Sequence, residues 1–255
     1  MLPLLAIIIL KGGALLFACL LVLFSCFGIF EFYRMALPGR TLEVWLAALS
    51  GAALIFTPFA AGDFTALTAV GLLFLFFAIL FLFRIREIAD AAREVAYALL
   101  AFIYIPFLLM HLVMLRQTEF GVQWLIVIML IVMTNDSAAY YIGSRFGKNR
   151  LYPLVSPKKS IEGALGGVLG SICGTLLAKF TFFQQLTFTD AVVTAVVIGI
   201  LGQVGDLFES MLKRSFGVKD SGTIFPGHGG ALDRLDSILF AAPATYYYVV
   251  YIFKG

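Results

Sequence analysis

The sequence predicts an all-α fold, a polytopic integral membrane helix bundle. Of its 255 residues, 62% are hydrophobic and 13% are charged, whereas a soluble domain carries roughly a quarter charged residues. The mean hydropathy of +1.01 supports the same class. Apolar runs follow one another with no linker between them, which favours a single integral membrane domain over residues 1–255.

Eight apolar runs are long enough to cross a bilayer, which requires roughly 20 residues in a helix. The opening run, residues 1–10, has about half of that length before Lys11 and two glycines interrupt it. The prediction is therefore nine helices in total, eight full spans plus a short N-terminal hydrophobic segment. The spans are predicted at 13–33, 43–61, 65–83, 95–115, 122–142, 163–181, 189–209 and 234–253.

The basic residues of the connecting segments predict the orientation in the membrane. Fourteen of the eighteen Lys and Arg residues lie in segments that follow alternate spans, and four lie on the opposite side. Because cytoplasmic loops are enriched in Lys and Arg, we expect the fourteen to face the cytoplasm of a bacterial-type cytoplasmic (inner) membrane. No segment is a polybasic tract, so no nucleic-acid partner is expected.

Asp136 falls late in the predicted span 122–142. A carboxylate at that depth costs several kcal/mol unless it is paired or faces water, so an acid inside a span is a functional candidate. The alternative is an Asp paired with a neighbouring base for packing alone.

The segment Ser156-Pro157-Lys158-Lys159 is predicted to begin a helix. Ser suits the N-cap position and Pro the first helical position. Two lysines in a first turn oppose the helix dipole, which favours anions there, so this placement suggests that they meet phosphate. The alternative is that they only anchor the segment on the cytoplasmic side.

The segment Gly205–Ser237 is the most polar stretch of the chain. Asp206 and Glu209 end one predicted span, and Asp233 and Asp236 share a face where the last span begins. The glycines between these acids allow tight turns and close approach of a ligand. Paired carboxylates beside a basic loop suit Mg²⁺, which completes its coordination with water and phosphate oxygens. A salt-bridged cytoplasmic loop is the alternative interpretation.

His228 lies between glycines within this segment. It could donate a hydrogen bond to phosphate or transfer a proton. Zinc is a poor fit, because no second His or Cys lies nearby. With these residues assigned, the chain divides into N-terminal hydrophobic helices, residues 1–120, and catalytic helices with cytoplasmic loops, residues 121–255.

At these residues the sequence closely resembles the phosphatidate cytidylyltransferase family, the CDP-diacylglycerol synthases. Upstream blocks around Asp136 and Ser156–Lys159 resemble other blocks of that family in the same order. The chain departs from the family at Ser160-Ile161, where Thr-Trp is common. The family signature is matched at thirteen positions: Ser210, Lys213, Arg214, Lys219, Asp220, Pro226, Gly227, His228, Gly229, Gly230, Asp233, Arg234 and Asp236.

The resemblance implies transfer of CMP from CTP to phosphatidate, with Mg²⁺, possibly more than one ion, as cofactor. It implies CTP, phosphatidate in the bilayer and other membrane lipids as partners, and a homodimer. The residues expected to be catalytic are Asp206, Lys213, Arg214, Lys219, His228, Asp233 and Asp236. Those expected to bind substrate are Ser156, Lys158, Lys159, Ser210, Gly229, Gly230 and Arg234. The expected metal ligands are Asp136, Asp206, Asp233 and Asp236.

Two other functions fit parts of the sequence. An ion or phosphate transporter also places acids inside spans, but it predicts acids spread over several spans, whereas most acids here gather at one face. A cytidylyltransferase acting on another lipid phosphate would share the same residues. A CDP-alcohol phosphotransferase is not supported, because its aspartate pattern is missing from the sequence.

Overall fold

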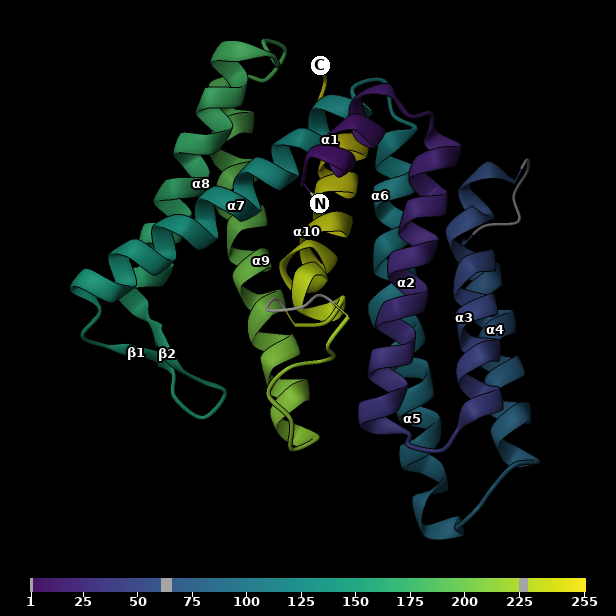
Figure 1. Ribbon diagram of the computed structural model, residues 1–255. Helices are drawn as coiled ribbons and strands as arrows, with labels where there is room; N and C mark the ends of the chain where they lie inside the picture. The colour runs from purple at the N-terminus through teal and green to yellow at the C-terminus, as the bar shows by residue number, and fades with distance from the viewer. Residues whose placement is uncertain (1, 61–65, 225–228) are drawn as a thin grey trace. The chain divides into compact units, whose positions relative to one another are not determined.

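The computed structural model describes residues 2–60, 66–224 and 229–255, and it is almost entirely helical (Figure 1). The N-terminal part contains α1 (Leu2–Lys11), α2 (Ala14–Ala36), α3 (Thr41–Phe56) with the 3₁₀ turn η1 (Thr57–Phe59), α4 (Ala66–Leu82), the 3₁₀ turn η2 (Ile88–Asp90), α5 (Ala91–Phe102), the π-helical turn η3 (Ile103–Phe107) and α6 (Leu108–Arg116). The C-terminal part contains α7 (Gly121–Phe146), β1 (Arg150–Tyr152), β2 (Ser156–Ser160), α8 (Ile161–Thr181), α9 (Phe188–Ser215) and α10 (Leu232–Tyr251).

A helix lies at every position where the hydropathy predicts one, so the prediction of a polytopic membrane protein is confirmed. Among the described residues, six helical stretches are long and apolar enough to span a membrane: α2, α3 with η1, the continuous stretch Ile88–Arg116, α7, α8 and α9. The apolar stretch described for α4 is shorter than these six. The first five residues of α10 include three charged ones, Asp233, Arg234 and Asp236.

The chain forms two compact units. The first contains residues 1–11, 114–219 and 234–255, and the second contains residues 12–113 and 220–233. Two helices, α6 and α10, begin in the second unit and end in the first. The sequence-based prediction of one integral domain divided near residue 120 stays a prediction.

In the first unit, α8 packs closely on α7 because α8 presents glycines to its neighbour. A Cβ added at Gly167 would lie 2.7 Å from Gln203 Nε2 and would also clash with Asn135 Oδ1. A Cβ at Gly170 would lie 2.6 Å from the Thr134 carbonyl oxygen. Small residues at such contacts are what membrane helices use to bring backbones together.

The helix predicted to begin at Ser156 begins instead at Ile161. Residues Ser156–Ser160 form strand β2, which pairs antiparallel with β1. The helix N-cap is Ser160, whose hydroxyl oxygen accepts a hydrogen bond from the Gly163 amide at 3.1 Å. A capping serine was available at either position. Because residues from Ser156 to Ser160 pair with β1 as an extended strand, the helix begins only after Ser160. Figure 1 shows the resulting hairpin between the ends of α7 and α8.

In the second unit, a buried ion cluster joins α3 to the connection before α5. Arg40 and Glu43 are 3% and 1% exposed, and Arg40 Nη1 lies 2.9 Å from Glu43 Oε1. Arg84 Nε approaches the same oxygen at 2.8 Å, and Arg40 also pairs with Glu94. Because each buried charge has an opposite partner, the cluster compensates for the loss of water around it.

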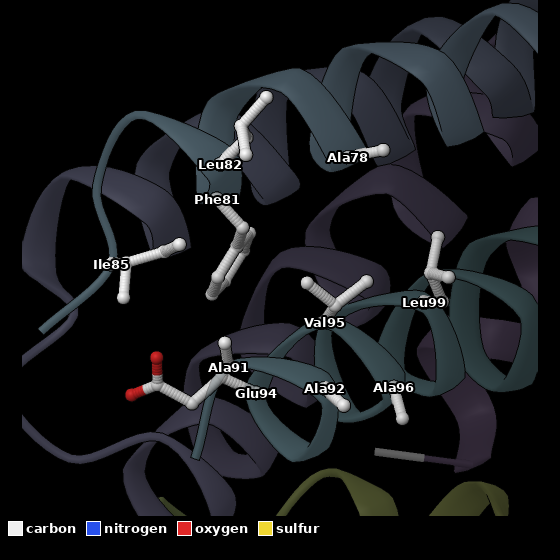
Figure 2. Close-up of a pocket in the computed structure, with 10 residues that line it drawn as sticks. All are labelled: Ala78, Phe81, Leu82, Ile85, Ala91, Ala92, Glu94, Val95, Ala96 and Leu99. Atoms are coloured by element: carbon white, nitrogen blue, oxygen red, sulfur yellow. The ribbon is translucent and has the colours of Figure 1, made fainter. Parts of the chain in front are cut away.

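An open cavity of about 420 Å³ lies between α4 and α5 in the same unit. Figure 2 shows it lined by apolar side chains such as Phe81, Leu82 and Leu99, with the Glu94 carboxylate at one end. None of the predicted site residues lines it. Its lining suits hydrocarbon and offers little to a nucleotide.

Candidate active site

Three acids of the first unit come together from three helices. Asp136 lies on α7, Asp206 on α9 and Asp236 on α10. The Asp206 charge acts on both Asp136 and Asp236, and the Asp136 charge acts on Asp236. The helices α9 and α10 touch at this level, since a Cβ added to Gly205 would lie 2.5 Å from the Asp236 carbonyl oxygen. The site therefore concentrates negative charge.

Lys159 brings the hairpin to these acids. Its ammonium group forms a salt bridge with Asp206 Oδ2, and both side chains are 30% exposed. On the other side of the carboxylate, Ser210 Oγ lies 3.4 Å from Asp206 Oδ1. Lys159 and Asp136, which are distant in sequence from the Gly205–Ser237 segment, thus both approach it at Asp206. Lys158 and Ser156 lie on the same strand, Lys158 exposed and Ser156 half-buried.

Lys213 is held within the protein by Glu209. The Nζ–Oε2 distance is 2.6 Å, Glu209 is 2% exposed and Lys213 9% exposed. The two residues are one helical turn apart on α9, which is the spacing that lets such a pair meet. The Lys213 charge also acts on Asp236. Glu209 thus places a cation beside the acid group.

The other predicted bases are on the surface. Arg214, Lys219 and Arg234 are exposed. Arg214 Nη1 donates to the Val218 carbonyl oxygen at 3.1 Å, which ties it to the turn after α9. His228, the remaining predicted catalytic residue, lies outside the described residues.

The remaining described site residues lie in the second unit, where the Asp233 carboxylate contacts Ser221 and Gly230. Its Oδ2 accepts hydrogen bonds from the Ser221 amide at 3.0 Å, the Ser221 hydroxyl at 3.0 Å and the Gly230 amide at 2.8 Å. Gly229 has a φ of +80°, a left-handed conformation that favours glycine. A Cβ at Gly229 would also lie 3.1 Å from Asp233 Cγ.

The chemistry of these acids fits a hard cation, since carboxylate oxygens are the ligands that Mg²⁺ takes from proteins. Within the described part of the chain, however, no three acidic, His or Cys side chains lie close enough together to hold a metal ion. The Asp206 carboxylate is paired with Lys159 instead. Magnesium therefore remains a proposal.

A sequence model of the cytidylyltransferase family matches residues 1–252. The chain belongs to the cytidylyltransferase family. Its enzyme class is therefore nucleotidyltransferase, and its apolar helices make this cytidylyltransferase a multi-pass membrane protein.

Relatives of this cytidylyltransferase include three proteins named phosphatidate cytidylyltransferase. The one from Staphylococcus epidermidis is 34% identical over 242 residues, which are 92% of this chain and 90% of the relative. The Thermotoga maritima protein is 37% identical over 166 residues, 63% of this chain and 61% of its own length. The Bacillus subtilis protein is 36% identical over 155 residues, 60% of this chain and 58% of its own length.

Two groups of polar contacts in this cytidylyltransferase were not predicted from the sequence. Asn135 Nδ2 donates to the Gly199 carbonyl oxygen at 2.9 Å, and Gln203 Nε2 donates to Asn135 Oδ1 at 2.8 Å. These bonds join α7 to α9 beside Asp136 and Asp206. The second group centres on Glu31 of α2, which is 5% exposed. An acid within an apolar predicted span was the signal that could have identified Glu31.

Proposed function

We propose that the protein is a phosphatidate cytidylyltransferase, which converts CTP and phosphatidate to CDP-diacylglycerol and pyrophosphate. The observation that carries this proposal is the salt bridge between Lys159 and Asp206. It joins the upstream Ser156–Lys159 block to α9, the helix that also carries the signature residues Ser210, Lys213 and Arg214. The names of the relatives support phosphatidate as the acceptor.

In the proposed reaction, a phosphate oxygen of phosphatidate attacks the α-phosphorus of CTP. A new P–O bond forms, the bond to the bridging oxygen of the β-phosphate breaks, and pyrophosphate leaves. The nucleophile is already an anion, so little general-base assistance is required. The obstacle is repulsion between two anions, and catalysis then depends mainly on positioning and electrostatics.

The basic residues are suited to reduce that repulsion. Lys159 and Lys213 are placed beside the acids by Asp206 and Glu209, so their positions are fixed before the substrates bind. Lys158, Arg214, Lys219 and Arg234 are exposed cations that we assign to the triphosphate and the lipid headgroup. Ser156, Ser210, Gly229 and Gly230 remain proposed substrate contacts, and His228 a proposed catalytic residue.

We propose Mg²⁺ as cofactor. Its proposed ligands are Asp136, Asp206 and Asp236 of the first unit, and Asp233 of the second unit is a further candidate. When bound, Mg²⁺ would neutralise phosphate charge and stabilise the leaving pyrophosphate. The acids of this chain would orient the two phosphates around that charge. We also propose that the site faces the cytoplasm of the bacterial inner membrane, so that a lipid headgroup and a soluble nucleotide meet while the acyl chains stay in the bilayer.

Purified protein in detergent tests the proposal. We expect pyrophosphate release from CTP when phosphatidate is present, and much less with a polyprenyl phosphate of matched concentration. Release with the polyprenyl phosphate but not with phosphatidate would mean that the acceptor is another lipid phosphate. No release with either acceptor, together with ion or phosphate flux in proteoliposomes, would favour a transporter.

A further inference from the structure

The carboxylate of Glu31 is surrounded by donors from the signature loop within the second unit. Its Oε2 accepts a hydrogen bond from the Leu232 amide at 3.0 Å. It also lies 3.0 Å from the Ser221 hydroxyl oxygen, whose single proton is shared with Asp233 Oδ2. Glu31 Oε1 accepts a hydrogen bond from the Ala231 amide at 2.8 Å. Glu31 therefore contacts both ends of the loop that runs from Ser221 to Leu232.

Two of these donors belong to the start of α10. The first amides of a helix lack partners within the helix, and a negative charge near them is favourable. Glu31 satisfies the Ala231 and Leu232 amides, while Asp233 satisfies the Gly230 amide. The Leu232 amide, which is the first of α10, and the two amides just before it thus bind two carboxylates of the protein itself.

Glycines provide the space for this carboxylate. A Cβ added at Gly222 would clash with Glu31, because it would lie 2.8 Å from Glu31 Cδ. One turn earlier on α2, Gly28 accommodates Leu232, whose Cδ2 would lie 3.1 Å from an added Cβ. The contact between α2 and the loop therefore combines the Glu31 carboxylate against Gly222 with the Leu232 side chain against Gly28.

Ser221 connects Glu31 to the proposed catalytic machinery. Its hydroxyl oxygen lies 3.0 Å from both Glu31 Oε2 and Asp233 Oδ2. Ser221 is 3% exposed, so these contacts are shielded from water. A shift of Glu31 would move Ser221, and with it Asp233.

We propose that Glu31 is a positioning residue, which from α2 holds Ser221, Ala231 and Leu232 in place and thereby fixes the orientation of Asp233. The inference rests on the proposed function, because its consequence for catalysis requires that Asp233 acts in the reaction. Glu31 itself needs no contact with substrate.

The matched variants are Glu31→Gln and Glu43→Gln, both changes of a buried carboxylate in the second unit. Glu43 pairs with Arg40 and Arg84 and has no hydrogen bond to the loop among those described. We expect Glu31→Gln to lower kcat on the order of a hundredfold, as a misplaced catalytic group can do. Glu43→Gln should retain kcat per folded molecule within about threefold of the wild type, even if its Tm falls as much as that of Glu31→Gln.

A compensating pair tests the contact itself. Gly222→Ala should lower kcat because the added methyl group displaces the Glu31 carboxylate. Combining it with Glu31→Asp, a shorter acid, should recover at least about tenfold of that loss. General destabilisation predicts that the two changes add, with no recovery.

Amide hydrogen exchange provides a readout that needs no activity. In Glu31→Gln, the peptide that contains Ala231 and Leu232 should exchange faster than in the wild type, and in Glu43→Gln it should not. Unchanged exchange there, or equal loss of kcat in both Gln variants, would overturn the proposal. If the wild type shows no CTP turnover, the proposed function fails, while the exchange result still decides whether Glu31 holds the loop.

Discussion

The ammonium group of Lys159, at the end of the β1–β2 hairpin, is in salt-bridge contact with the carboxylate of Asp206 on α9. An ion pair this exposed contributes only about 0–1 kcal/mol to stability. Its significance is therefore placement. Lys159 puts a cation at the point where Asp136, Asp206 and Asp236 gather negative charge.

Replacing Lys159 should reduce catalysis without unfolding the protein. We expect Lys159→Ala to lower kcat/KM by roughly a hundred- to a thousandfold, as the loss of one electrostatic contact to a transition state can do. Its Tm should stay close to the wild type. Steady-state kinetics and a thermal melt in the same detergent measure both quantities.

Lys148→Ala is the matched control for this change, since Lys148 is an exposed lysine just before the same hairpin. It should retain wild-type kcat/KM. Equal losses in the two variants would mean that only the local positive charge matters, and the specific pairing with Asp206 would be refuted.

Removing divalent metal should abolish turnover, and Mg²⁺ should restore it. The Asp206→Asn variant should require a higher Mg²⁺ concentration for half-maximal rate, because it loses one charged oxygen ligand. Asp190→Asn is the control on the same helix, where Asp190 is bound by Thr187 and Tyr248. Full turnover in excess chelator would contradict the magnesium proposal.

Enlarging a glycine between α7, α8 and α9 should destabilise the first unit. An Ala at Gly167 would press against Asn135 and Gln203, and overpacking of this kind costs about 1–3 kcal/mol. Gly71→Ala is the control, because an added Cβ at Gly71 would meet nothing within 4 Å. A lower Tm is expected for Gly167→Ala alone; similar Tm values for both variants would argue against tight packing there.

The cytoplasmic orientation can be tested by labelling. With Cys19, Cys26 and Cys173 replaced, a single cysteine at exposed Lys148 should react with an impermeant thiol reagent in inside-out vesicles. Right-side-out vesicles should show little labelling. The reverse pattern would place the hairpin outside and invert the predicted topology.

The helices were predictable because hydropathy is a local property and a bilayer requires long apolar runs. The hairpin was not, since Ser156 and Ser160 are both good N-cap residues. Only pairing of the whole segment Ser156–Ser160 with β1 delays the helix to Ile161. The pairing of Glu209 with Lys213 followed from helical spacing. Glu31 could not be connected to Ser221 from sequence alone, because their contact joins segments far apart in the chain.

The most direct test of the central claim follows the phosphorus atoms of CTP. The purified protein is incubated with phosphatidate, Mg²⁺ and CTP labelled at either the α- or the γ-phosphate. The account predicts that the α-label enters the lipid as CDP-diacylglycerol and that the γ-label leaves as pyrophosphate. At the same Mg²⁺ concentration, Asp206→Asn should form both products more slowly. Transfer of the γ-label to lipid, or no labelled lipid at all, would contradict the account.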